Sequence, residues 1–185
     1  MTPFAARGLV AGAMLLAASS QAAEISDEEA VARARPAELV VASDLPAARR
    51  AAMLRPVEAF YGFWNNGSPA LLAAALAPGF TDHTLPPGRS QGLAGPTAAV
   101  KAFMTAVPDL RCQVVQRLVV GDRVVSHLRF TGHFTGSFMG RAGAGQVVDF
   151  IATDILRVRN GRVTDNWHIE DNLTFLRQIG AAPPP

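Results

Sequence analysis

Residues 161–180, GRVTDNWHIEDNLTFLRQIG, place a strand, two adjacent carboxylates and a helix in immediate succession. The Asn160-Gly161 pair is typical of a tight hairpin turn, so a strand is expected over residues 162–170. Side chains alternate along a strand, and the odd-numbered side chains of this segment are mostly apolar. Uninterrupted alternation therefore predicts that Asp171 points into the protein, on the same face as Trp167.

Asp171 has two interpretations. An acid among apolar groups holds its proton more tightly, which suits a carboxylate that transfers protons. The same residue directly precedes a helical pattern at residues 172–179, where its side chain would cap free backbone N–H groups. The neighbouring acid, Glu170, is expected on the polar face, in contact with solvent. The local sequence leaves both roles of Asp171 open.

The rest of the chain predicts an α+β fold. Apolar patterns of period two, joined in part by short glycine turns, indicate four antiparallel strands, at residues 110–120, 122–134, 146–159 and 162–170. Helical patterns precede them, at residues 47–65, from Ser68 to before Pro78, and at residues 97–106. Helices that bury one face of a curved sheet would leave a pocket between the two layers.

The two ends of the chain are expected to lie outside this domain. Residues 1–23 combine a basic start, an apolar run and small residues at a cleavage site, which is the pattern of a signal peptide. We interpret residues 24–46 as a linker with a possible short helix, outside the core, residues 47–180 as the folded domain and residues 181–185 as a disordered tail. An exported protein, periplasmic or secreted, with no membrane segment after cleavage, is therefore expected.

Composition argues against several classes of function. The chain has 185 residues, a formal net charge of +2 and a single lysine, Lys101, so no basic patch for nucleic acid is expected. Its one cysteine, Cys112, excludes an internal disulfide and lies in an apolar alternating run, which is typical of a buried side chain. No histidine pair has the helical spacing of a zinc site, so no metal is expected.

Four motifs, taken in their order and spacing, resemble one protein family. They are FTDHTLP at residues 80–86, VPDL at 107–110, TGHFTGSFMG at 131–140, and the ending Trp167, Asp171 and Gln178-Ile179-Gly180. Over about residues 55–180 the chain resembles the SnoaL-like polyketide (ester) cyclases of the nuclear-transport-factor-2-like superfamily. The resemblance implies a cone, in which a curved antiparallel sheet is wrapped by N-terminal helices around an apolar pocket.

The resemblance also implies a catalytic site. The acid/base of these cyclases is an Asp four residues after the last Trp, which is Asp171 here, and His83 matches the histidine of the family's Asp-His pair. The implied reaction removes a proton beside a carbonyl and closes a ring by an aldol step, with neither metal nor cofactor. Because members of the superfamily often dimerise through the convex face of the sheet, the resemblance allows a homodimer.

Further side chains are expected to line the pocket, namely Asp154, Trp167, Phe134, Tyr61 and Trp64. Asp154 interrupts an apolar strand face, where an acid is costly unless it is paired or functional. It is either a second pocket acid or the partner of an arginine. Phe134 stands where the family often has a histidine, and alternation predicts that His133 points away from the pocket. Tyr61 and Trp64 also fit a purely structural role in the core.

These features predict an exported, cofactor-free enzyme that uses one Asp as acid/base on a small apolar carbonyl compound. The reaction would be that of an aldol cyclase, an isomerase or a dehydratase, since the superfamily hosts several chemistries. The competing prediction is a non-catalytic periplasmic protein that binds a small molecule in the same pocket, with Asp171 serving only as a helix cap.

Overall fold

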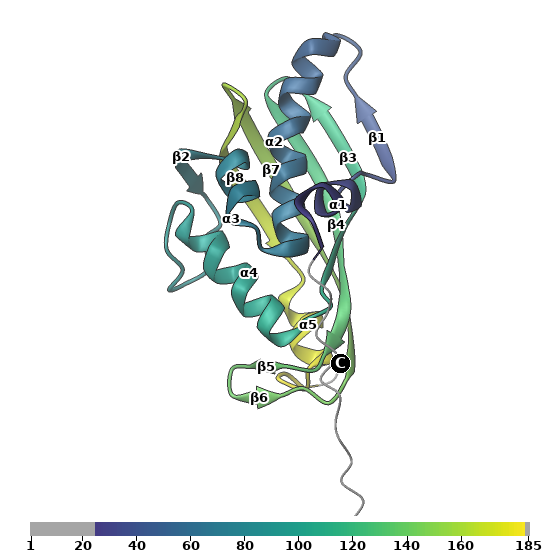
Figure 1. The fold of residues 1–185 in the computed structure, drawn as a ribbon, viewed down its shortest axis with the longest axis vertical. Helices are drawn as coiled ribbons and strands as arrows, with labels where there is room; N and C mark the ends of the chain where they lie inside the picture. The colour runs from purple at the N-terminus through teal and green to yellow at the C-terminus, as the bar shows by residue number, and fades with distance from the viewer. Residues whose placement is uncertain (1–24, 184–185) are drawn as a thin grey trace, which may run out of the picture.

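Six strands form one curved sheet, and helices cover one of its faces (Figure 1). The computed structural model describes residues 25–183, so the predicted signal peptide at residues 1–23 lies outside the described residues, as do residues 184–185. The strands lie in the order β1-β3-β4-β7-β8-β2, and β5 (Ser137–Phe138) and β6 (Arg141–Ala142) form a separate hairpin. The predicted α+β class is confirmed.

The four predicted strands form the centre of the sheet as an antiparallel meander. They are β3 (Arg111–Val120), β4 (Arg123–Phe134), β7 (Gln146–Arg159) and β8 (Arg162–Glu170). Positive φ angles at Gly121 and at Asn160-Gly161 make the tight turns that join β3 to β4 and β7 to β8. The two edge strands run parallel to their neighbours: β1 (Glu38–Val41) pairs with β3, and β2 (Leu76–Asp82) pairs with β8.

The predicted helices are present with small changes at their ends. They are α2 (Ala47–Asn66), α3 (Pro69–Ala75), α4 (Ala94–Ala106) and α5 (Asn172–Gln178). Gly67 ends α2 in the left-handed conformation at φ 71°, and the Ser68 side chain caps α3 by accepting the N–H of Leu71. Within residues 25–183, no helix is long and apolar enough to span a membrane bilayer.

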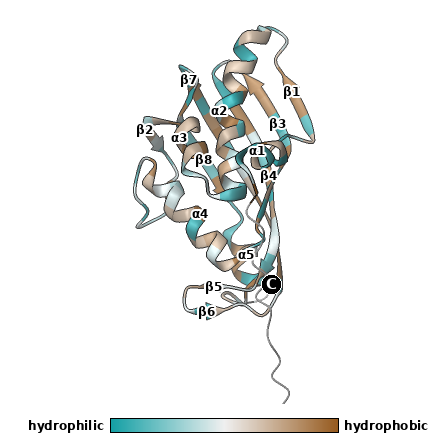
Figure 2. Cartoon of the chain, viewed as in Figure 1, coloured by the Kyte–Doolittle hydropathy of each residue, from teal (hydrophilic) through white to brown (hydrophobic). Residues whose placement is uncertain are grey.

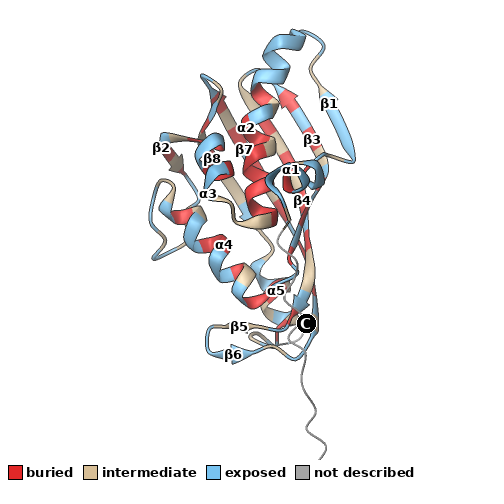
Figure 3. Ribbon diagram, in the orientation of Figure 1, coloured by how far each residue is buried: buried red, intermediate tan, exposed pale blue. Residues whose placement is uncertain are grey.

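The core lies between α2, α4 and the concave face of the sheet. Figure 2 shows apolar stretches on the central strands, and Figure 3 shows that α2 and the strands behind it are buried where they meet. Trp64 of α2 packs edge-on against Phe103 of α4 and Phe130 of β4, at ring-centroid distances of 6.2 and 5.7 Å. Removal of these large apolar surfaces from water is the main force that holds the two layers together.

The prediction that residues 24–46 form a linker outside the core is wrong, although the short helix that it allowed is present. Residues 27–33 form α1 (Asp27–Arg33), whose Ala30 is fully buried, and β1 extends the sheet beside β3. The packing of α1 on α2 depends on small residues, because a Cβ added to Gly62 would come within 2.8 Å of Val31. A short segment of small and charged residues carries little hydrophobic periodicity, so its sequence pattern gave no sign of this packing.

The predicted tail at residues 181–185 begins inside the fold. Ala181 packs against the core, and the carbonyl of Pro183 accepts a hydrogen bond from Nε of Arg177 at 3.1 Å. Residues 181–183 are therefore ordered against the end of α5, which corrects the prediction for this part of the tail.

Two β-bulges interrupt the alternation of side chains. Thr164 is an extra residue of β8 in the register with β7, and Val115 is an extra residue of β3 in the register with β4. A single extra residue exchanges the inward and outward faces for the rest of its strand. Beyond Thr164, the even-numbered residues of β8 therefore point toward the helices, which reverses the pattern expected from uninterrupted alternation.

Candidate active site

A small cavity lies between the helices and the concave face of the sheet. Its volume is about 30 Å³, which is room for one or two water molecules. Its apolar wall comes from α2, β2, α4 and β4, through Phe60, Trp64, Phe80, Pro96, Leu128 and Phe130. Its polar wall comes from β2, β7, β8 and the loop after β2, through Asp82, Arg89, Asp154, Asn166, His168 and Glu170. The expected pocket is present, but half of its lining residues are polar.

Five polar side chains form one row across the concave face. Arg117 of β3 lies opposite Ser126 of β4, which in turn lies opposite Asp154 of β7. Asp154 lies opposite His168 of β8, whose Nε2 is 3.1 Å from Oδ2 of Asp82 on β2. All five side chains are buried or nearly so. The bulges align this row, because without them Arg117 and His168 would point to the outer face.

Asp154 is a buried acid at the centre of the row. Its Oδ2 accepts a hydrogen bond from the Tyr61 hydroxyl at 2.9 Å. Burial raises the pKa of Asp154 to about 6, against the charge of His168 and the hydrogen bonds of Tyr61 and Asn166, which favour the ionised form. Among the described residues it has no ion pair with an arginine, so the geometry favours the interpretation as a pocket acid. A carboxyl group with this pKa exchanges protons near neutral pH.

His168 and Asp82 form a buried pair beside Asp154. Burial alone would lower the pKa of His168, but the hydrogen bond and charge of Asp82 raise it, with help from Glu170 and Asp154. Burial alone would raise the pKa of Asp82, but hydrogen bonds from His168 and Thr84 hold it below its usual value. With Nε2 engaged by Asp82, the other ring nitrogen, Nδ1, lies 3.7 Å from Oε1 of Glu170.

Two other lining residues offer contacts to a ligand. Oδ1 of Asn166 is buried and has no hydrogen-bond partner among the described residues. An unpaired buried acceptor is costly, so a donor from a ligand or water would be stabilising there. Arg89, in the loop between β2 and α4, is the only arginine or lysine among the lining residues. Within residues 25–183, no cluster of three or more His, Cys, Asp or Glu is arranged to hold a metal ion.

Asp171 does not line the cavity. It is the N-cap of α5, where its Oδ1 accepts the N–H of Thr174 at 3.0 Å and its Oδ2 accepts the Thr174 hydroxyl at 2.7 Å. These bonds hold the pKa of Asp171 below its usual value, the opposite of the shift expected for an acid among apolar groups. The predicted inward orientation is wrong because of the bulge at Thr164: Glu170 lines the cavity instead, while Ile169 is 78% exposed. The alternative prediction, a helix cap, is confirmed.

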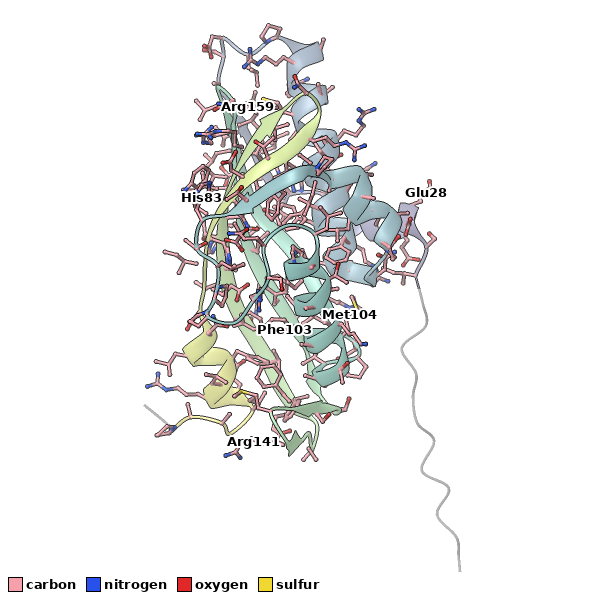
Figure 4. All side chains as sticks on the ribbon, turned by 90° about the vertical axis from the view of Figure 1, so that its left-hand side faces the viewer. Glu28, His83, Phe103, Met104, Arg141 and Arg159 are labelled. Carbon is pink, nitrogen blue, oxygen red and sulfur yellow. The ribbon has the colours of Figure 1, made fainter. Side chains whose placement is uncertain are left out.

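His83 and Trp167 lie on the outer face of the sheet, and Figure 4 shows His83 on the side away from α2 and α4. Their rings stack at a centroid distance of 4.3 Å and an interplanar angle of 4°. His83 Nε2 is 2.8 Å from Oδ1 of Asp165, and the guanidinium groups of Arg123 and Arg157 lie 5.3 Å from the Trp167 ring centroid. The predicted pocket positions of His83 and Trp167 are therefore wrong, and in each case an adjacent residue of the chain faces the cavity.

The other predicted lining residues have three different outcomes. Trp64 lines the cavity as predicted. Tyr61 is fully buried behind the lining and reaches the site through its hydrogen bond to Asp154. Phe134 is fully buried in the core and is absent from the lining, which corrects its predicted role. His133 points to the surface as predicted, where Nδ1 is 2.7 Å from Oδ2 of Asp109.

Sequence reasoning missed most of the polar wall, namely Asp82, Arg89, Asn166, His168 and Glu170. A local signal existed for Asp82, because it directly precedes His83 in the chain and the two match the Asp-His pair of the family. The sequence does not show which of these two side chains faces inward. For β8 no local signal separates a regular strand from one with an extra residue, so Glu170 was expected to be in contact with solvent.

Comparisons with known proteins agree with this architecture. The family model described as SnoaL-like polyketide cyclase matches residues 55–179. The chain is similar to the structure of a presumed polyketide cyclase of Bacillus cereus, at 35% identity and a TM-score of 0.75, covering 82% of this chain and 95% of that one. It is also similar to IdmH, a presumed polyketide cyclase of Streptomyces antibioticus, at 26% identity and a TM-score of 0.62, covering 69% and 98%.

A more distant similarity concerns the fold alone. A Catenulispora acidiphila protein with a ketosteroid isomerase-like fold matches at 20% identity and a TM-score of 0.54, covering 70% of this chain and 97% of that one. A search of curated proteins found no match.

Proposed function

Because the chain belongs to the SnoaL-like polyketide cyclase family, we propose that it is a cofactor-free acid/base enzyme acting on a small carbonyl compound, with Asp154 and His168 as the proton-transferring pair. The observation that carries the proposal is that this buried acid and this histidine are direct cross-strand partners that both line the cavity. Titratable groups with shifted pKa values in a cleft are typical of acid/base sites.

Asp154 is the base in this proposal. Its carboxylate takes the proton from the carbon next to the substrate carbonyl, and the electrons of the broken C–H bond form an enolate. Protonated His168 donates its Nδ1 proton to the enolate oxygen, because Nε2 is engaged by Asp82. In a substrate with a C=C bond conjugated to the enol, Asp154 returns its proton to the far carbon of that bond while the enol oxygen returns its proton to His168, which gives an isomer of the substrate.

Ring closure follows from the same enol when the substrate carries a second carbonyl. The enol carbon attacks that carbonyl carbon, and the new C–C bond converts its oxygen to an alkoxide. The alkoxide takes the proton held by Asp154, and the enol oxygen returns its proton to His168. Both side chains then have their starting charges, so the cycle consumes no co-reactant.

Neighbouring side chains support the pair. The Tyr61 hydroxyl occupies Oδ2 of Asp154 and leaves Oδ1 for the substrate. The carboxylate of Asp82 fixes the ring of His168 and favours its charged form. Oδ1 of Asn166 is an acceptor for a substrate hydroxyl or N–H group.

The size of the cavity limits how a substrate enters. A volume of about 30 Å³ admits water and excludes a carbonyl compound of several carbons. Substrate binding therefore requires some lining side chains to move. Arg89 belongs to the loop between β2 and α4, and it is the lining residue that this loop contributes.

Non-catalytic binding of a small molecule is the second candidate function. The unpaired acceptor on Asn166 favours it, because a ligand hydroxyl or N–H group would satisfy this buried oxygen without any turnover. The two candidates differ in whether bound compounds exchange protons with the protein.

Deuterium exchange tests the proposal. A panel of small ketones and β-diketones is incubated with the protein in D2O, and exchange at the carbons next to the carbonyl is followed by NMR. We expect Asp154→Asn to slow exchange by about 10²-fold or more, while Asp171→Asn, which alters an acid outside the cavity, exchanges at the wild-type rate. Equal rates in wild type and Asp154→Asn overturn the assignment, and saturable binding without exchange supports the binding protein.

Export and self-association are separate proposals that rest on the sequence and on the resemblance. Export is tested by N-terminal sequencing of the protein recovered outside the cytoplasm, where a chain that still starts at Met1 contradicts it.

Self-association is tested by light scattering at several protein concentrations, where a constant monomer mass contradicts it.

A further inference from the structure

A buried arginine belongs to the polar row but does not line the cavity. Arg117 is fully buried, and its Nε donates to Oγ of Ser126 at 3.2 Å and its Nη2 to the carbonyl of Ala34 at 3.3 Å. Its ion-pair partner, Glu58, is 3.8 Å from Nη1, and Nη1 makes no hydrogen bond among the described residues. A buried charge whose ion-pair partner is 3.8 Å away adds little to the stability of the fold. A contribution to folding stability therefore does not explain why an arginine occupies position 117.

Hydroxyl groups connect Arg117 to the acid of the cavity. Ser126 is the cross-strand partner of Arg117 on one side and of Asp154 on the other. The guanidinium carbon of Arg117 also lies 5.4 Å from the centre of the Tyr61 ring, a cation–π contact. The Tyr61 hydroxyl then donates to Oδ2 of Asp154 at 2.9 Å.

The electrostatics of Tyr61 are consistent with this connection. Burial raises the pKa of Tyr61 well above its usual value, so its hydroxyl stays protonated and remains a donor. The hydrogen bond of Ser126 and the charge of Arg117 act in the opposite direction and make that hydroxyl more acidic. A more acidic donor forms a stronger hydrogen bond to a carboxylate.

We propose that Arg117 is a positioning residue, which holds the Tyr61 hydroxyl against the Asp154 carboxylate from outside the cavity. Ser126 also connects Arg117 to the Tyr61 hydroxyl, because its oxygen accepts a hydrogen bond from Nε of Arg117. The cation thereby stabilises the ionised acid without entering the cavity and competing for the substrate. The inference rests on the proposed role of Asp154 as the base, but its test requires no substrate.

The test is the pKa of Asp154, measured by carboxyl ¹³C NMR titration and assigned through the signal lost in Asp154→Asn. We expect Arg117→Met to raise this pKa by about one unit, because the donor chain loses its cation. Arg129→Met is the matched control, because Arg129 pairs with Asp149 on the exposed face of the sheet. It is expected to leave the pKa of Asp154 unchanged.

The route through Tyr61 is tested by a double variant. In a Tyr61→Phe background, Arg117→Met is expected to shift the pKa of Asp154 much less than it does in the wild type, because the donor between them is gone. A lower melting temperature with an unchanged pKa of Asp154 in Arg117→Met would show a purely structural role and overturn the inference.

A second variant keeps the test decisive if Arg117→Met does not fold. Ser126→Ala removes the hydroxyl that lies between Arg117 and Asp154 in the row. It is also expected to raise the pKa of Asp154, and an unchanged pKa would contradict the inference. If no deuterium exchange is catalysed but the pKa of Asp154 shifts in Arg117→Met, the proposed enzyme function is contradicted. Arg117 is then the positioning residue of a binding site.

Discussion

Asp154 of β7 and His168 of β8 are direct cross-strand partners at the cavity, and Asp82 of β2 holds the histidine from the next strand. Burial raises the pKa of Asp154 to about 6, while Asp82 outweighs burial and raises that of His168. Above about pH 6 and below the raised pKa of His168, the acid is ionised and the histidine is protonated. The sheet thus sets a base and an acid side by side in the charge states that proton transfer requires.

The first prediction concerns the pH dependence of activity. Activity should rise as Asp154 loses its proton at about pH 6 and fall as His168 loses its proton above its usual pKa of 6.5, giving a bell-shaped profile. Asp82→Asn removes the carboxylate that favours the charged histidine, so the alkaline limb should move to lower pH. Exchange rates measured across pH check this, and an alkaline limb that does not move contradicts it.

The second prediction concerns the cost of burying Asp154. The folded pKa of about 6 exceeds the ordinary value of 3.8, so the folded state binds a proton more tightly between these values and loses stability as pH rises through them. Two pKa units correspond to about 3 kcal/mol at full ionisation. The unfolding free energy of Asp154→Asn, relative to wild type, should therefore increase by up to this amount between about pH 4 and pH 7.5 in urea titrations.

Asp171→Asn is the control for that measurement because its sign is opposite. The folded pKa of Asp171 is lowered, so its ionised form contributes stability that is present above its ordinary pKa and is lost as pH falls through the folded pKa. Relative to wild type, Asp171→Asn should be less stable at neutral pH than at low pH. The same trend with pH in both variants would show that the burial of Asp154 does not set its pKa.

The third prediction separates capping from catalysis at Asp171. Asp171→Ala removes the acceptor of the Thr174 N–H and hydroxyl, so the melting temperature should fall by a few degrees. Exchange activity measured well below the melting temperature should equal that of the wild type, because the carboxylate does not line the cavity. A loss of activity with unchanged stability would restore Asp171 as the acid/base.

The fourth prediction concerns a close approach of two backbones. A Cβ added to Gly136 would lie 1.8 Å from the carbonyl oxygen of Thr105, at the end of α4. Gly136→Ala must push these segments apart, and we expect a loss of about 3 kcal/mol in chemical denaturation. Gly79→Ala is the matched control, because no atom lies within 4 Å of its added Cβ. Equal stability of the two variants would contradict the close packing.

Much of the fold could be predicted from periodicity and turn chemistry. The central strands β3, β4, β7 and β8 match their predicted ranges to within one residue, because alternation and tight turns are local signals. The edge strand β1 and the packing of helix α1 on the core were missed because short elements of small or charged residues depend on tertiary contacts. The site was predicted less well. Asp154 and Trp64 line the cavity as expected, whereas Asp171, His83 and Trp167 do not.

The sequence by itself determined the four central strands and the family, since each depends on residues close together in the chain or on motifs in a fixed order. Tertiary structure decided which side chains form the site. One extra residue, Thr164, turns His168 and Glu170 inward and leaves Trp167 outside. Whether a strand bulges depends on its register with its neighbours and on packing against the helices, and the strand's own sequence does not carry that information.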